Sequence, residues 1–102
     1  MSDEQRGYLI AYDIADDTRR ARIVKLLRRC GERLQYSVFL LRIRPAAVLR
    51  LRADLETVID RREDAVLICD LGRRDTAKQT MTFIGRRSYS DTVIPTVIWH
   101  VT

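Results

Sequence analysis

Asp13 is the residue of this sequence best suited to do chemistry, because it is an acid at the carboxyl end of a short apolar segment. The segment Tyr8–Ile14 reads YLIAYDI, and its aromatic and β-branched residues are typical of a buried strand. If packing were the only purpose of this position, an apolar side chain would serve it better. Magnesium prefers hard oxygen ligands and commonly uses only one or two carboxylates beside water and phosphate. Asp13 is therefore a candidate metal ligand for phosphodiester chemistry.

One carboxylate per chain is too few for a firm metal site. Two copies of Asp13, brought together by a twofold axis, would supply a better one. The alternative is that Asp13 serves only as a turn or capping carboxylate. The next two acids, Asp16 and Asp17, are interpreted as helix caps rather than ligands, because they immediately precede a helical pattern.

Positive charge could bring a polyanionic partner to this acid. The chain carries 19 Lys and Arg against 14 Asp and Glu, which gives a net charge of +5. All of these cations except Lys25 and Lys78 are arginines, whose planar guanidinium can contact a phosphate through two hydrogen bonds. Arg20 and Arg22, at the start of the first predicted helix, are candidates to hold phosphate near Asp13. The alternative for both is a solvated helix face.

For the other residues whose side chains could bind or react, the sequence offers a structural alternative or lacks the partners that the chemistry would need. Tyr12 and Phe39 could stack on bases, but core packing is the alternative for both. Ser37 has no His and Asp arranged as a relay, which argues against a serine hydrolase. Cys30 and Cys69 stand apart without a CxxC pair, which argues against a zinc site and predicts two reduced core residues of a cytoplasmic protein.

The sequence gives no sign of a membrane segment. Its longest apolar runs are far shorter than the roughly 20 residues that span a bilayer, and the acidic N-terminus is unlike a secretory signal. A chain of 102 residues is expected to form one domain, residues 1–102, without room for a deep internal active site. We expect any site to lie at an edge or between subunits.

The elements that must position Asp13 follow from hydrophobic spacing. Apolar residues recur at helical spacing after Arg19, which predicts a helix over Thr18–Cys30 that stops at Gly31. The next segment, Arg33–Ile43, is a strand region in which Tyr36-Ser37 marks either a sharp bend or a tight hairpin.

The second half of the pattern repeats the first. Pro45 predicts the first turn of a second helix, which runs to about Asp60. Another strand is expected over Ala65–Leu71, closed by Gly72. The order strand, helix, strand region, helix, strand predicts an α+β, ferredoxin-like βαββαβ fold if the strand region folds into two. Its core would cover about residues 7–71, with two helices on one face of an antiparallel sheet.

The C-terminal part carries one further strand signal. Residues 73–90 hold no usable motif, whereas Thr92–Val101 is strongly β-prone. Pro95 cannot donate to a ladder, so this strand belongs at a sheet edge. A βαββαβ sheet has no place for it, and we expect the segment at about residues 91–102 to pair with the edge of a second subunit.

Two motifs at a fixed separation are specific in combination. They read YDI-x-DD-x-x-R from Tyr12 to Arg20 and, after Gly31, QYSVF from Gln35 to Phe39. In this combination the chain resembles the CRISPR-associated Cas-two family, which comprises small ferredoxin-like proteins of prokaryotic spacer acquisition. The likeness covers about residues 7–71. The chain departs from many members in having Leu40, rather than an acid, directly after SVF.

The resemblance implies a homodimer in which the two Asp13 carboxylates face each other and bind Mg²⁺ or Mn²⁺. Family members described as nucleases use that pair to cleave RNA or double-stranded DNA. The other residues that the resemblance places at this cleft would bind nucleic acid (Arg20, Arg22 and Arg33) or shape the site (Tyr12, Ser37 and Phe39).

The resemblance also implies a protein partner, the Cas-one integrase, whose dimers the family bridges in the prokaryotic cytoplasm. In that role the protein would be a non-catalytic scaffold that grips duplex DNA through its backbone. Two further functions are compatible with the residues. One is that of a toxin ribonuclease related to the virulence-associated protein D family, and the second is that of an oligomerisation module that binds no nucleic acid. No membrane partner is expected.

Overall fold

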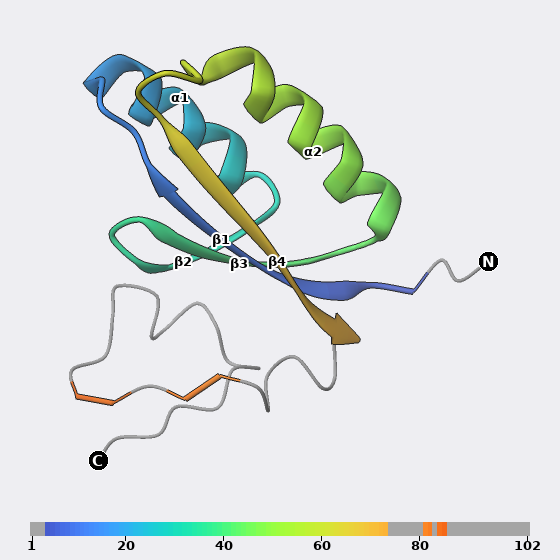
Figure 1. Ribbon diagram of the computed structural model, residues 1–102. Helices are drawn as coiled ribbons and strands as arrows, with labels where there is room; N and C mark the ends of the chain where they lie inside the picture. Colours follow the sequence, from blue (N-terminus) through green and yellow to red (C-terminus); the bar gives the residue numbers. More distant parts are fainter. Residues whose placement is uncertain (1–3, 74–80, 83, 86–102) are drawn as a thin grey trace.

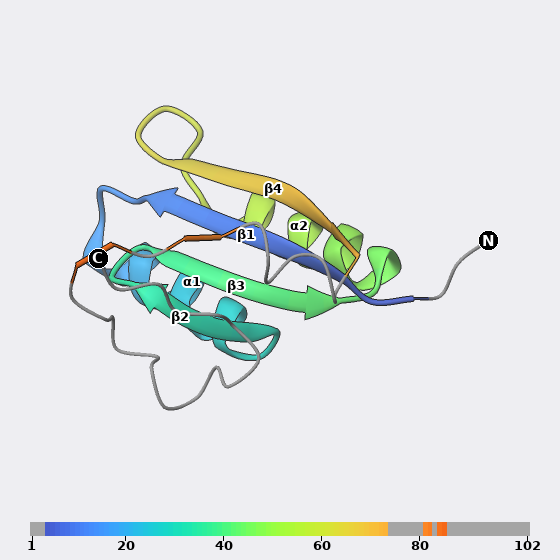
Figure 2. The same ribbon diagram turned by 90° about the horizontal axis from the view of Figure 1, so that it is seen from below.

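The computed structural model describes residues 4–73, 81–82 and 84–85, which form one sheet and two helices (Figure 1). The elements, in chain order, are β1 (Arg6–Asp13), α1 (Asp17–Arg28), β2 (Gly31–Gln35), β3 (Val38–Ile43), α2 (Pro45–Val58) and β4 (Ala65–Arg73). The strands lie in the order β2-β3-β1-β4, and each neighbouring pair is antiparallel. Both helices cover the same face of the sheet (Figure 2). This is the predicted ferredoxin-like βαββαβ fold.

The described residues correspond to the core that was expected at about residues 7–71. The predicted C-terminal strand, Thr92–Val101, lies outside them, as does most of the segment 73–90. In the part of the chain that the structure describes, neither helix is long and apolar enough to span a membrane.

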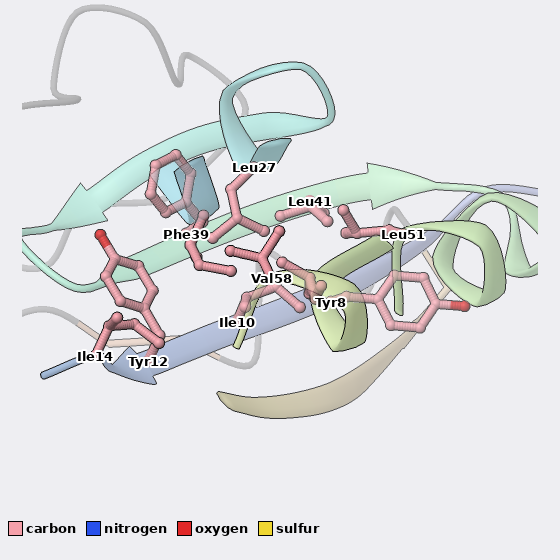
Figure 3. Close-up of a cluster of buried hydrophobic side chains, with 11 residues drawn as sticks. Tyr8, Ile10, Tyr12, Ile14, Leu27, Phe39, Leu41, Leu51 and Val58 are labelled. Carbon is pink, nitrogen blue, oxygen red and sulfur yellow. The ribbon is translucent and has the colours of Figure 1, made fainter. Parts of the chain in front are cut away.

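The main core is formed by alternate residues of the strands together with one face of each helix (Figure 3). Its fully buried side chains include Ile10 of β1, Phe39 and Leu41 of β3, and Ile23 and Leu27 of α1. Burial of one such side chain stabilises the fold by about 1.5–3 kcal/mol. Because β1 is the strand between β3 and β4, this core fixes the strand that carries the candidate acid.

The opposite face of the sheet is apolar as well, although neither α1 nor α2 covers it (Figure 2). Leu34 and Leu40 are buried in a second cluster there, and Leu9, Val38 and Leu71 pack against them. We refer to this side as the helix-free face. The two apolar faces explain why β1 reads as a nearly continuous apolar run rather than as an alternating one.

The start of α1 confirms one interpretation drawn from the sequence. The helix begins at Asp17 and ends at Arg28, so the predicted start was one residue late and the predicted end two residues late. Asp16 is the N-cap, and its carboxylate accepts a hydrogen bond of 2.9 Å from the backbone N–H of Arg19. Asp16 is therefore a capping residue, as expected.

Gly31 does not stop the helix, contrary to the prediction. It is the first residue of β2, where it pairs with Leu41 of β3. A Cβ atom at Gly31 would lie 2.3 Å from the carbonyl oxygen of Leu40. The backbone of the hairpin approaches so closely at this point that only glycine fits.

The substitution Gly31→Ala tests this explanation. We expect it to lower the free energy of unfolding by about 1–3 kcal/mol, the usual cost of overpacking. The reason is that the methyl group meets backbone rather than the movable end of a side chain. Urea denaturation followed by circular dichroism would measure the loss. An unfolding midpoint equal to that of the wild type would contradict the proposed close contact.

The remaining boundaries settle three further expectations. Tyr36-Ser37 joins β2 to β3 as a tight hairpin, so a bend within one strand is excluded. α2 begins at Pro45, as predicted, and ends two residues before the expected Asp60. The prediction that Gly72 closes the last strand is wrong, because β4 continues to Arg73. Gly72 has a φ of 94°, and it accommodates a bulge opposite β1.

The cysteines correct another expectation. Both are free thiols, but Cys69 is exposed and Cys30 is only half-buried, so neither is a fully buried core residue. The reason for Cys69 is its position in β4. Its neighbour Ile68 packs against the main core, and successive strand residues point to opposite faces, so Cys69 falls on the helix-free face. Partial burial raises the pKa of the Cys30 thiol.

Candidate functional site

Asp13 is the last residue of β1 and is exposed to solvent. Its carboxylate makes no hydrogen bond or ion pair with any residue that the structure describes. By strand alternation it falls on the same face as Leu9 and Ala11, the helix-free face. Asp13 also lines an open depression of about 440 Å³. The acid is therefore exposed at the pocket, and among the described residues its carboxylate caps neither a turn nor a helix.

The hairpin between β2 and β3 forms the opposite wall of this depression, which we call the Asp13 pocket. The pocket is lined by Tyr12, Asp13, Ile14, Arg20, Tyr36 and Ser37. The hydroxyl group of Tyr12 donates a hydrogen bond of 2.9 Å to the carbonyl oxygen of Tyr36. The backbone N–H of Tyr12 donates to the carbonyl oxygen of Ser37 at 3.1 Å. These two bonds hold the hairpin tip against the end of β1.

The two aromatic residues singled out from the sequence belong to the core. Tyr12 is 6% exposed and Phe39 is fully buried, so neither ring is open to a stacking base. Their ring centroids lie 6.3 Å apart. Tyr12 and Phe39 therefore shape the pocket from beneath, and their role is the packing role of the alternative hypothesis.

Arg20 is brought directly to the loop that follows Asp13. One of its guanidinium nitrogens donates a hydrogen bond of 2.7 Å to the carbonyl oxygen of Ile14, and the other pairs with Asp17. The Asp17 carboxylate raises the pKa of Arg20 further above its ordinary value. These contacts keep a permanent positive charge at the edge of the Asp13 pocket.

Arg33 lies behind the hairpin tip rather than in the Asp13 pocket itself. Its guanidinium carbon is 5.7 Å from the ring centroid of Tyr36 and 5.5 Å from that of Phe39. It also approaches the hydroxyl group of Tyr12 at 3.5 Å. The stacked geometry is typical of a cation–π contact, so Arg33 supports the hairpin tip and adds positive charge beside it.

Arg22 is not brought to this pocket. It is exposed, and it lines a separate groove between the two helices together with Arg29 and Asp54. The separation has a geometric cause, because two residues along a helix rotate the side-chain direction by about 200°. Of the basic residues that the resemblance placed near Asp13, the fold brings Arg20 to the Asp13 pocket, places Arg33 behind its wall and leaves Arg22 in a separate groove.

The buried ion pair Arg19–Asp64 also positions the site, although the sequence pattern did not predict it. The Asp64 side chain is fully buried, and its two oxygens accept hydrogen bonds of 2.7 and 3.2 Å from the Arg19 guanidinium. The same carboxylate accepts 2.9 Å and 2.8 Å bonds from the backbone N–H groups of Ala15 and Asp60. Asp64 thus ties the loop after Asp13 to the turn before β4.

The Arg19 guanidinium and the backbone donors hold the pKa of Asp64 well below its usual range. The only sequence signal for this pair was an acid just before an apolar strand. The partner lies 45 residues away, and no local pattern connects the two.

The sequence profile of the family described as CRISPR associated protein Cas2 matches residues 7–79. A CRISPR-associated endoribonuclease Cas2 of Rhodospirillum rubrum is 33% identical over 85 residues, 83% of each chain. A CRISPR-associated endoribonuclease Cas2 of Thermus thermophilus is 45% identical over 60 residues, which cover 59% of this chain and 64% of the relative. The matched part thus spans less than two thirds of the length of that relative.

Solved structures agree with the sequence comparisons. Streptococcus pyogenes Cas2 superposes with a TM-score of 0.69 and 25% identity, over 78% of this chain and 99% of that one. A hypothetical protein of Thermus thermophilus, TT1823, gives a TM-score of 0.65 and 38% identity, over 67% and 83% of the two chains. The match of the family profile to most of the chain, on a fold that these structures share, shows that the chain belongs to the CRISPR-associated Cas2 family.

Proposed function

We propose that this protein is a homodimeric, divalent-metal-dependent endonuclease that acts in CRISPR spacer acquisition and cleaves phosphodiesters in RNA or double-stranded DNA. One observation carries the proposal. Asp13 is the exposed last residue of the inner strand β1, and its carboxylate has no hydrogen-bond or ion-pair partner among the described residues. Arg20 lines the same pocket. An acid left free next to a held cation is suited to a metal ion and a phosphate.

The names of the relatives support the same activity. The Rhodospirillum rubrum relative reported above and a further relative, from Geobacter sulfurreducens, are each called an endoribonuclease. Another relative, from Thermus thermophilus, is called an endonuclease. These names leave the substrate open between RNA and DNA. They favour a nuclease of the CRISPR system over a toxin or a pure oligomerisation module.

The residues present fit part of a magnesium or manganese site. Asp13 offers hard carboxylate oxygens, but the described residues contain no group of three or more His, Cys, Asp or Glu that could hold a metal ion. Asp13 of a second copy, water and a substrate phosphate would have to supply the other ligands. When bound, such an ion polarises the phosphate and makes water a better nucleophile at neutral pH.

The chain's own residues would orient the substrate. Arg20 is fixed on Ile14 and would offset negative charge as it develops on the phosphate. Tyr12 and Ser37 hold the hairpin tip beside the acid, so the substrate meets a preformed wall. Arg33 is stacked behind that wall and lends it a second positive charge.

The apolar helix-free face of the sheet supports pairing of two copies. The helix-free face is apolar, and Leu67 on β4 is 61% exposed. By strand alternation Leu67 shares this face with Asp13, because its neighbours Val66 and Ile68 pack into the main core. A twofold contact through the helix-free face would bury this leucine and bring the two acids toward each other.

The excess of arginine favours a second function, the non-catalytic scaffold. Arg22 and its neighbours on the helices carry positive charge away from the Asp13 pocket, where cleavage would not need it. Such a surface can grip a duplex through its phosphates without reading the sequence. The Cas-one integrase is the expected protein partner of this role, and the two functions are compatible.

A cleavage assay tests the proposed function. Purified protein would be incubated with labelled single-stranded RNA and duplex DNA in Mg²⁺, Mn²⁺ or EDTA. We expect cleavage with either metal and none in EDTA, because water needs the metal ion to become a competent nucleophile beside Asp13. Cleavage that persists in EDTA, or no cleavage of either substrate, would contradict the nuclease and leave the scaffold function.

A further inference from the structure

A second depression lies along the outer side of α1, between that helix and the hairpin of β2 and β3. It has a volume of about 500 Å³. We call it the α1 groove. Its lining includes four cations and one aromatic ring, contributed by Arg20, Lys25, Arg28, Arg33 and Tyr36.

The α1 groove adjoins the Asp13 pocket. Arg20 and Tyr36 line both depressions and therefore lie between them. A flexible chain that occupied the groove would therefore pass directly to the candidate acid. The groove that contains Arg22 shares Lys25 with the α1 groove, but it has no lining residue in common with the Asp13 pocket among those that the structure describes.

The charge of the α1 groove suits a polyanion. The one acid of its described lining, Asp17, is paired with Arg20. Lys25 and Arg28 are exposed, and neither forms an ion pair with any of the residues that the structure describes. Arg20 and Arg28 are eight residues apart on α1, a rise of about 12 Å, which matches about three to four phosphates of a stacked strand.

The aromatic ring distinguishes a single strand from a duplex. Tyr36 is 60% exposed at the hairpin tip, and the Arg33 guanidinium supports it 5.7 Å from the ring centroid. An exposed tyrosine on a cationic track is the usual platform for an unpaired base. A duplex offers the faces of its bases only at its ends, so the ring adds little to duplex binding.

We infer that a single-stranded segment of nucleic acid reaches Asp13 through the α1 groove, with its phosphates on Lys25 and Arg28 and one unpaired base stacked on Tyr36. The inference rests on the proposed function, which it deepens by naming the strand's path and the residues that hold it. Binding in the groove does not require the metal ion, so it can be measured without cleavage.

The first test compares two substitutions, each of which removes one arginine charge. Arg28→Ala alters the groove, whereas Arg50→Ala alters the exposed side of α2, outside the groove. Dissociation constants for a labelled single strand, and for a duplex of the same sequence, would be measured by fluorescence anisotropy in EDTA over a salt series. We expect Arg28→Ala to weaken single-strand binding at least about threefold and to reduce the salt slope by about 0.7, the value for one phosphate contact. Arg50→Ala should stay within about twofold of the wild type.

The second test concerns the ring. Tyr36→Ala is expected to weaken single-strand binding by at least about fivefold, the lower end for loss of one stacked base. Its effect on the duplex should stay within about twofold. Tyr36→Phe keeps the ring and should bind as the wild type does, which separates stacking from any contribution of the hydroxyl group. The thermal unfolding midpoint of each variant confirms that the hairpin still folds.

Three results would overturn the inference: equal weakening by Arg28→Ala and Arg50→Ala, an equal effect of Tyr36→Ala on single strand and duplex, or no single-strand binding by the wild type. Failure here is distinguishable from failure of the proposed function. If cleavage depends on Asp13 but ignores the groove variants, the path is wrong and the nuclease stands. If the groove binds a single strand as expected and no cleavage occurs, the path stands and the nuclease is wrong.

Discussion

Asp13→Asn is expected to lower the rate of metal-dependent cleavage by at least about 100-fold, because an amide cannot supply the charge that holds a divalent cation. The substitution keeps the size and shape of the side chain. Since Asp13 is exposed and makes no hydrogen bond or ion pair with a described residue, the fold should be unaffected. Initial rates at saturating Mg²⁺, with protein prepared in parallel, would measure the loss. Equal rates for both proteins would point to a contaminating nuclease.

A mixing experiment asks whether two copies of Asp13 form one site. Wild type and Asp13→Asn would be unfolded together, refolded and assayed at several ratios. If both acids of a dimer are needed, activity falls with the square of the wild-type fraction, to about one quarter at an equal mixture. If each acid works alone, activity falls linearly, to about one half. The linear result would contradict the shared site while leaving Asp13 as the catalytic residue.

Asp64→Asn is expected to lower the midpoint of thermal unfolding at pH 7 by several degrees. The change leaves the Arg19 guanidinium beside a neutral amide and weakens the acceptor for the backbone of Ala15 and Asp60. The pKa of Asp64 is lowered in the folded protein, so its contribution to stability is fully present above the ordinary pKa of about 4. That contribution is lost as the pH falls below this value toward the folded-state pKa.

The wild type and Asp64→Asn should therefore converge in stability as the solution is acidified below about pH 4. Thermal unfolding at several pH values would show the convergence. Glu63→Gln is the matched control, because Glu63 also pairs with Arg19 but its side chain is 58% exposed. It should change the midpoint little at any pH. A difference between wild type and Asp64→Asn that stays constant down to about pH 2 would contradict the ion-pair explanation.

Asp64 also supports the Asp13 pocket. Asp64 reaches the loop after Asp13 through the backbone of Ala15, so loss of the ion pair loosens the segment that carries the acid. The Asp13 pocket is therefore supported from two sides, by this ion pair and by the hydrogen bonds of Tyr12 to the hairpin tip. Of these two supports, only the hydrogen bonds of Tyr12 involve the motif YDI, on which the resemblance to the family rests.

The order of the elements follows from the amino-acid sequence alone. Apolar spacing identified both helices and the strands of the described core, with boundary errors of about two residues at most. The start of α1 was predicted to within one residue because the local cap Asp16 sets it. The same spacing placed Asp13 at the end of a buried strand. Gly31 was misinterpreted because the carbonyl oxygen that makes glycine necessary belongs to Leu40, on the neighbouring strand.

Which side chains meet depends instead on how the elements pack. Arg20 and Arg22 are two residues apart, yet one contacts the loop after Asp13 and the other lies in a separate groove. Arg19 and Asp64 are 45 residues apart and form the buried ion pair beneath that loop. Periodicity reports which residues of one element share a face, whereas a contact between elements depends on strand order and packing. The composition of the site is therefore a property of the folded sheet and not of any segment.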